Sequence, residues 1–364
     1  MPVPAALDPL LKQCQPCFHT RIGRQSFRFL GDQTIWSEIA RFYRPYFVFS
    51  SGDSPETAIA VYAVLDKTLK TTPPVTDMRK YIARSLDVQR DGAIEVHYRP
   101  AGPRVYVDRT SRRVIVVAGH GLELLLQCRV MVRDQLFRPQ ERMNGYFSFH
   151  ASAVVRGGKA TLFMGERNAG KTTCMLSCLA GGRYSLLSAD RVILSIQNGK
   201  VVVKGTPARC NIHRQTMESD PLLQGIAANH VDQYDHEGKT LVPIDRIAEL
   251  AGVNVTATAE LGAIVLPRVD PSRVGVELAL IDKPELRRKL LYDSLLECNS
   301  AADGYGLWFE FFEEKREENE HAIARIVELM ARDASFISIA ASHAKLVEKL
   351  RASDIESFPA AIAP

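Results

Sequence analysis

The segment FMGERNAGKTT, residues 163–173, places the strongest constraint on the fold of this chain. A short apolar run, residues 160–164, leads into it, and a helical pattern at residues 171–180 follows it until Gly181 and Gly182. Two glycines five residues apart, followed by lysine and threonine, allow a loop to turn its backbone N–H groups inward around an anion. The helix that begins at the lysine adds the positive end of its dipole. The segment therefore predicts a strand, a phosphate-binding loop and a helix in direct succession.

The positions of this loop have separate predicted roles in binding a nucleotide. Lys171 supplies an ammonium to the β- and γ-phosphates, and the Thr172 hydroxyl is a ligand for Mg²⁺. The pattern arises by chance in roughly one sequence of this length in a hundred, and the flanking strand and helix raise its specificity. The loop reads phosphates and not the base, so ATP and GTP both remain open. The predicted nucleotide-binding residues are Gly165, Glu166, Arg167, Asn168, Ala169, Gly170, Lys171, Thr172 and Thr173.

A change of pattern near residue 140 divides the chain in two. The stretch RPQERMNG, residues 138–145, is polar and carries Pro and Gly, which favours a boundary there. We therefore predict an N-terminal α+β domain at residues 1–140 and an α/β domain at residues 141–364. The elements expected in the first domain include a helix at 77–87, strands at 93–100, 104–110 and 112–119, and a helix at 121–137.

Tight turns join several strands of the second domain, which predicts a mixed sheet in place of a purely parallel one. The turn RGGK at 156–159 connects a predicted strand at 146–155 to the strand of the loop. Asn198-Gly199 between two apolar runs predicts a second hairpin. The other expected elements are strands at 184–190, 260–269 and 334–340 and helices at 283–297, 319–331 and 342–353.

This order of motifs resembles the HPr kinase/phosphorylase family and its wider relatives, which share a nucleotide-binding core with phosphoenolpyruvate carboxykinase. The resemblance extends over roughly residues 146–353. It implies an α/β fold in which a mixed sheet surrounds a phosphate-loop core, and an activity that needs ATP or GTP and Mg²⁺. The motifs that carry it are FHASAVV (149–155), GERNAGKTT (165–173), LLSADRVIL (186–194) and GTPAR (205–209).

The chain departs from HPr kinase itself in two places. It has Ala189-Asp190 where that enzyme has two acidic residues, and the signature Glu-x-Arg-Gly-x-Gly is missing after residue 209. It therefore looks more like the divergent kinases of this group, some of which phosphorylate a serine hydroxyl on peptides in natural-product pathways. The resemblance also leaves room for a homo-oligomer, since members of the family assemble into oligomers.

Asp190 is the predicted acid of the site. It ends an apolar stretch about 19 residues after Lys171, where a carboxylate can hold the water shell of a metal or accept a hydroxyl proton. The resemblance assigns the equivalent acid the same work, whereas a turn cap is the structural alternative. Together with Thr172, Asp190 is the predicted Mg²⁺ ligand.

His150 and Arg209 complete the predicted catalytic set with Asp190 and Lys171, and Arg268 is a further candidate. His150, on the predicted strand beside the loop strand, can bond the acceptor or the γ-phosphate, or can be an ordinary core residue. Arg209 and Arg268 each follow a predicted strand and can add positive charge to the transferring group, or can be surface residues. The polar segment at 220–240, which includes Lys239, is expected to be a loop near the substrate or a solvated loop without a role.

We therefore predict a phosphotransferase that moves the γ-phosphoryl group of ATP or GTP to a hydroxyl on a peptide or a small molecule. The N-terminal domain is the natural place for recognition of this acceptor. The alternatives are a nucleotide-dependent regulatory module with weak or no hydrolysis, and a small-molecule kinase of a biosynthetic pathway.

Composition limits the partners and the compartment that we expect. With 46 Lys and Arg against 42 Asp and Glu, the 364-residue chain has a net charge of +4. That value suits an anionic ligand and is too small to predict a nucleic-acid partner. No apolar run approaches the roughly 20 residues that span a bilayer, and the N-terminal residues do not have the pattern of a signal peptide. Seven scattered cysteines indicate reduced thiols, and hence a cytoplasmic protein.

Overall fold

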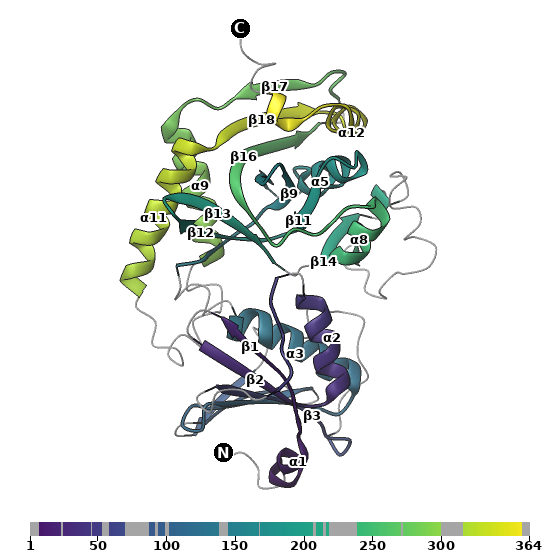
Figure 1. The fold of residues 1–364 in the computed structure, drawn as a ribbon, viewed down its shortest axis with the longest axis vertical. Coiled ribbons are helices and arrows are strands. Elements are labelled where there is room, and N and C mark those ends of the chain that lie inside the picture. Colours follow the sequence, from purple (N-terminus) through teal and green to yellow (C-terminus); the bar gives the residue numbers. More distant parts are fainter. Residues whose placement is uncertain are drawn as a thin grey trace. The chain divides into compact units, whose positions relative to one another are not determined.

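The computed structural model describes residues 7–22, 25–44, 46–52, 58–69, 87–91, 94–98, 102–137, 145–166, 168–206, 209–213, 216–217, 239–270, 272–299 and 316–358. These residues form two compact units, one that ends at residue 137 and one that begins at Gly145 (Figure 1). None of the helices in this described part of the chain combines the length and the apolar character that are needed to cross a membrane.

The first unit is built on a seven-stranded mixed sheet with the order β1-β2-β3-β7-β6-β5-β4. β2, β3 and β7 are parallel to one another, and all other neighbours in this sheet are antiparallel. β5, β6 and β7 match the three strands that the sequence predicts, and so does the turn between β6 and β7. The strands are β1 (Pro16–Ile22), β2 (Gln25–Gly31), β3 (Ile59–Leu65), β4 (Asp87–Asp91), β5 (Ile94–Tyr98), β6 (Arg104–Asp108) and β7 (Arg113–Ala118).

Helices cover both faces of this sheet. α2 (Gln33–Tyr43) and α3 (Gly121–Val130) pack against each other and against the sheet, whereas α1 (Asp8–Gln13) adds Leu10 and Leu11 to a cluster on the other face. α2 begins at Asp32, whose carboxylate accepts hydrogen bonds from the N–H groups of Thr34 and Ile35.

Two sequence predictions for this unit need comment. The expected helix at 121–137 is α-helical only as far as Val130 and continues as a π-helix, Met131–Phe137. Hydrogen bonds between residues five apart bring Met131 and Leu136 to the same side, and both are buried. Residues 77–86 of the expected helix at 77–87 lie outside the described residues. Its last residue, Asp87, is the first residue of β4.

The second unit contains a nine-stranded sheet with the order β11-β9-β10-β16-β13-β12-β8, to which β18 adds beside β16, with β17 beside β18. A separate two-stranded sheet pairs β14 with β15. The strands are β8 (Phe147–Phe149), β9 (Ser152–Arg156), β10 (Lys159–Phe163), β11 (Ser185–Ser188), β12 (Val192–Gln197), β13 (Lys200–Gly205), β14 (Arg209–His213), β15 (Lys239–Pro243), β16 (Thr258–Val269), β17 (Glu277–Leu280) and β18 (Ser335–Ala341).

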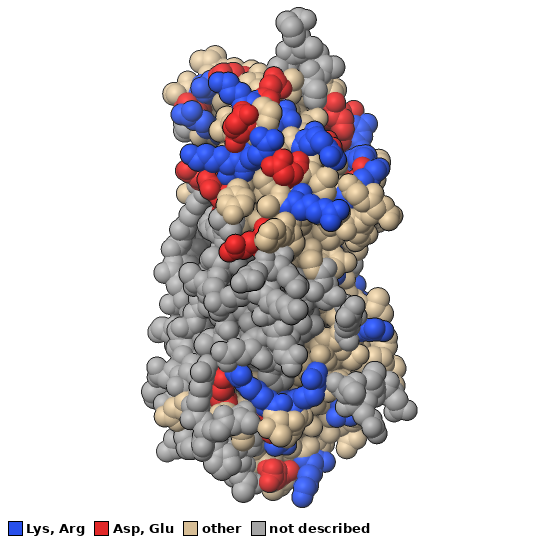
Figure 2. All heavy atoms as spheres, turned by 90° about the vertical axis from the view of Figure 1, so that its left-hand side faces the viewer, with Lys and Arg blue, Asp and Glu red and all other residues tan. Residues whose placement is uncertain are grey.

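Helices lie on both faces of the large sheet (Figure 1). α5 (Lys171–Ala180) packs against β9, β10 and β11 on one face and also contacts α8 (Ile244–Ala251) and α12 (His343–Ala352). α9 (Pro284–Asn299) and α11 (Arg316–Asp333) cover the other face, where Phe147, Leu162 and Phe336 belong to their common core. Acidic and basic side chains are interspersed over the surface of this second face, for example in the pair Arg288–Glu328 at 2.8 Å (Figure 2).

The predicted α/β class with a mixed sheet is confirmed. β10 is parallel to β16 and antiparallel to β9, which in turn is antiparallel to β11. The carboxyl ends of β10, β11, β16 and β18 and the beginning of β9 therefore meet at one edge of the sheet. Loops at this edge are the usual place for ligands in open α/β sheets.

Candidate functional site

The predicted phosphate loop occupies this edge, between β10 and α5. Its backbone has positive φ at Gly165 (142°), Asn168 (67°) and Gly170 (106°), so the chain turns sharply three times within six residues. Gly170 is the N-cap of α5 and offers no side chain to cap the helix. The N–H groups of the first turn of α5, which cannot bond within the helix, therefore point into the loop. Arg167 lies outside the described residues.

The Lys171 ammonium lies inside this loop. It donates hydrogen bonds to the carbonyl oxygens of Gly165, at 2.7 Å, and of Glu166, at 2.9 Å. Both acceptors are neutral, and a phosphate oxygen is a stronger acceptor for an ammonium than a carbonyl oxygen is. The lysine is therefore held where an anion entering the loop would meet it.

Asp190 lies at the same edge, two residues beyond the end of β11, in a turn that is fixed on both sides. The Ser152 hydroxyl donates to the carbonyl of Ala189 at 2.5 Å, and the Thr206 hydroxyl donates to that of Arg191 at 2.6 Å. The Ser188 hydroxyl also bonds the Arg191 carbonyl. These bonds hold the backbone before and after Asp190 and so place its carboxylate, 44% exposed, at the edge of the sheet.

His150 lies beside this acid. Its Nε2 lies 3.5 Å from Asp190 Oδ1, and 40% of its side chain is exposed. The prediction that His150 stands within a strand at 146–155 is wrong, because the strand is broken at His150 and Ala151. The reason is that β8 pairs with β12, whereas β9 pairs with β10 and β11, so the chain changes partners between them. This break places His150 at the site.

Cys210, on β14, connects the loop helix with the acid. It is fully buried, and burial raises the pKa of its thiol; the nearby Asp190 carboxylate raises it further, whereas a hydrogen bond with the Thr172 hydroxyl opposes both effects. The thiol therefore stays neutral. It lies against the Thr172 side chain and within electrostatic range of Asp190, the two predicted Mg²⁺ ligands.

These two oxygen ligands fit Mg²⁺ bound together with a nucleotide. Mg²⁺ takes one or two protein oxygens, substrate phosphates and water rather than a complete protein cage. Among the described residues, no group of three His, Cys, Asp or Glu side chains is arranged for a metal ion.

A second histidine, which no sequence pattern had indicated, reaches the phosphate loop. His213 ends β14, and its Nε2 lies 3.1 Å from Asn168 Oδ1 in the loop. The contact joins residues 45 positions apart and depends on the pairing of β14 with β15. No local pattern in the sequence indicates it.

The remaining predicted residues are placed less closely. Arg209 begins β14 and Lys239 begins β15, but their side chains lie outside the described part of the structure, as do residues 218–238. Arg268 is exposed near the end of β16. The pKa of Asp270 is lowered mainly by hydrogen bonds from Ser272, and the charge of Arg268 adds a smaller effect in the same direction. The roles proposed for these three residues stay predictions.

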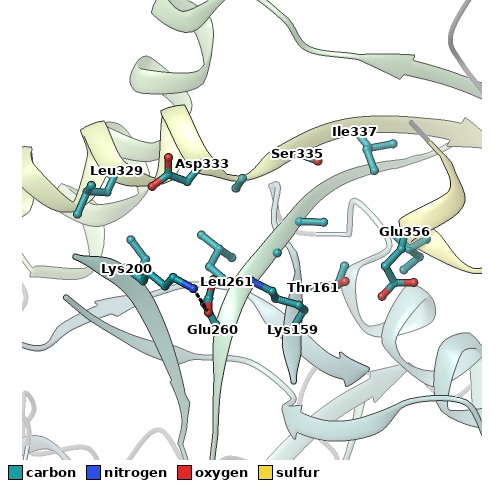
Figure 3. A pocket seen from close by; sticks show the side chains of 15 residues that line it. Lys159, Thr161, Lys200, Glu260, Leu261, Leu329, Asp333, Ser335, Ile337 and Glu356 are labelled. Atoms are coloured by element: carbon teal, nitrogen blue, oxygen red, sulfur yellow. Dashed lines mark hydrogen bonds and ion pairs between the residues drawn. The ribbon is translucent and has the colours of Figure 1, made fainter. Parts of the chain in front are cut away.

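A cavity of about 350 Å³ opens at the opposite edge of the sheet, where β10 and β16 begin (Figure 3). The ladder between β13 and β16 ends at Glu260 and the ladder between β16 and β18 begins at Ala263, so the sheet forks there. Glu260 accepts hydrogen bonds from Lys159 and, at 2.9 Å, from Lys200. None of the lining residues belongs to the phosphate loop, so the cavity is separate from the candidate site.

Comparison with known proteins adds little to this site. No protein-family model matches the chain, and no curated protein matches it. Among solved structures, the chain is similar to the Hpr(Ser) kinase/phosphatase from Coxiella burnetii, with 18% sequence identity, coverage of 37% of this chain and 77% of that chain, and a TM-score of 0.22. A similarity this low does not establish a shared family or activity, so the function of this chain rests on its own residues.

Proposed function

We propose that this protein is a kinase that transfers the γ-phosphoryl group of ATP or GTP to a hydroxyl group, on a peptide or a small molecule. The observation that carries the proposal is the His150–Asp190 pair at the same sheet edge as the phosphate loop. A phosphate loop alone is compatible with binding, whereas a half-exposed carboxylate paired with histidine beside it also provides a base for an acceptor hydroxyl.

The roles of the residues follow from their positions. The amides of the loop and the Lys171 ammonium bind the phosphates and offset the charge that develops during transfer. When bound, Mg²⁺ neutralises the β- and γ-phosphates, and Thr172 and Asp190 are the side chains that would hold it.

The transfer itself exchanges one bond to phosphorus for another. The acceptor oxygen forms a bond to the γ-phosphorus while the bond to the β,γ-bridging oxygen breaks, and the nucleoside diphosphate leaves. Asp190 accepts the hydroxyl proton, and His150, at 3.5 Å, stabilises the carboxylate in the orientation needed for this step.

The test is to measure ATP binding and phosphoryl transfer separately. We expect Asp190→Asn to retain the affinity for ATP measured without Mg²⁺ within about threefold, because the loop and Lys171 still bind the phosphates, and to lose at least a hundredfold in transfer, since a general base contributes about 10²–10⁴-fold. Lys171→Ala should weaken binding as well. Asp282→Asn, which changes an exposed carboxylate far from the loop, is the matched control and should change neither quantity.

Phosphorus NMR with host cell extract, divided by a size cutoff, reports the product. A new phosphomonoester in the small-molecule fraction would indicate a small-molecule acceptor, and one in the larger fraction a peptide. ATP binding without transfer in either fraction, unaffected by Asp190→Asn, would contradict the proposal and favour a nucleotide-dependent regulatory module.

A further inference from the structure

His213 contacts the phosphate loop, and the transfer described above does not use it. It is the last residue of β14, its side chain is exposed, and its Nε2 lies 3.1 Å from Asn168 Oδ1. Because an amide oxygen accepts hydrogen bonds and does not donate them, Nε2 carries the hydrogen in this contact. The ring therefore presents an N–H donor at the turn of the loop.

β14 runs beside the phosphate loop, and one contact near each end of the strand shows where it lies. Near its beginning, the buried Cys210 lies against the Thr172 side chain and within electrostatic range of Asp190. At its end, His213 meets Asn168. A strand advances about 3.3 Å per residue, so these two contacts are separated by about 10 Å. Side chains three residues apart on a strand point to opposite faces, so β14 runs beside the loop from Thr172 to Asn168 with Cys210 turned to the interior and His213 to the exposed side.

In the proposed function, the terminal phosphate of a bound nucleotide faces Thr172 and Asp190. β14 lies beside Thr172 near its beginning and brings the exposed His213 to Asn168 of the same loop. A charged phosphate oxygen accepts a stronger and shorter hydrogen bond than an amide oxygen does. In competition for the His213 N–H group, a terminal phosphate within reach displaces Asn168.

We propose that His213 is a γ-phosphate-binding residue, whose Nε2–H group exchanges the Asn168 oxygen for an oxygen of the γ-phosphate when a nucleoside triphosphate binds. The site then distinguishes a triphosphate from a diphosphate through this one side chain. After transfer, the diphosphate no longer offers a γ-phosphate oxygen, so the His213 side chain bonds Asn168 again. This favours release of the diphosphate. This inference rests on the proposed function, because it requires a nucleotide in the loop.

The test compares the affinities of ATP and ADP by titration calorimetry in the presence of Mg²⁺. We expect His213→Ala to weaken ATP binding by about tenfold or more, as expected for a lost hydrogen bond to a charged group, and to change ADP binding by less than about twofold. His213→Gln, which keeps an N–H donor, should recover most of the loss. His321→Ala, at an exposed histidine of α11, is the matched control and should change neither affinity.

The possible results separate this inference from the proposed function. Equal losses for ATP and ADP in His213→Ala, or no loss for either, would overturn the role of His213 while leaving the kinase intact. Lack of binding of both nucleotides to the unaltered protein would refute the proposed function itself. A loss confined to ATP, with recovery in His213→Gln, supports both.

Discussion

Gly170→Ala is the substitution that tests the geometry of the loop most directly. Gly170 has φ of 106°, which a residue with a Cβ atom adopts only with strain. A Cβ atom at this position would lie 2.7 Å from Val269 Cγ2, below the distance at which carbon atoms can pack. The glycine is therefore required twice, by its backbone conformation and by the close approach of β16.

The two effects have different expected sizes and can be separated. A left-handed backbone at alanine costs about 1–2 kcal/mol, and overpacking against the half-buried Val269 costs about 1–3 kcal/mol. We expect Gly170→Ala to lower the free energy of unfolding of the second unit by about 2–5 kcal/mol. Gly182→Ala is the matched control, because Gly182 has φ of 67° with no atom within 4 Å of its added Cβ. It should cost only about 1–2 kcal/mol.

Urea unfolding followed by circular dichroism measures both costs, and a second substitution identifies the contact. In a Val269→Ala background the offending methyl group is absent, so the cost of Gly170→Ala should fall by about 1–2 kcal/mol. Nucleotide affinity should drop at least tenfold in Gly170→Ala and recover in part in the double variant. An identical cost in both backgrounds, or a cost no larger than that of Gly182→Ala, would refute the close approach of β16 to the loop.

Two further predictions follow from pKa values. Since burial, assisted by Asp190, raises the pKa of Cys210, we expect its thiol to resist iodoacetamide at pH 8 in the folded protein and to react in urea, as read by mass spectrometry; labelling of the folded protein would contradict this. Burial acts to raise the pKa of Asp108, but hydrogen bonds from Ser111 and Arg113 outweigh it and hold the pKa below its ordinary value. Asp108→Asn should therefore cost about 1–3 kcal/mol at pH 7. This cost should shrink progressively as the pH falls below about 4, towards the lower pKa of the folded state; an equal cost at pH 3 and pH 7 would contradict it.

The parts of the second unit that the sequence predicted well are those with local causes. The predicted Asn198-Gly199 turn has positive φ at both residues, 51° and 77°, a conformation that Asn and Gly adopt readily and that matches the twist of a two-residue hairpin. The helix after the loop begins at Lys171 and ends at Ala180, before two glycines. In both cases the residues that determine the structure are adjacent in the chain.

The parts that were missed depend on partners far away in the sequence. Residues 146–155 alternate like a single strand, and nothing in them shows that β8 and β9 belong to different neighbours. The contact of His213 with Asn168 has the same origin, because it requires β14 to pair with β15 beside the loop. A single sequence carries the apolar pattern of each strand but not the order in which strands pair.

The mixed direction of the sheet is what allows a histidine and an aspartate to meet at the loop. In a purely parallel sheet only the residues that follow strands reach the carboxyl edge. Here the antiparallel β9 lies between β10 and β11, so its beginning reaches that edge together with their ends. His150, which precedes β9, and Asp190, which follows β11, are thereby brought within 3.5 Å of each other. Such a sheet doubles the kinds of position that can supply a site residue, and candidate residues in proteins of this type should be sought before strands as well as after them.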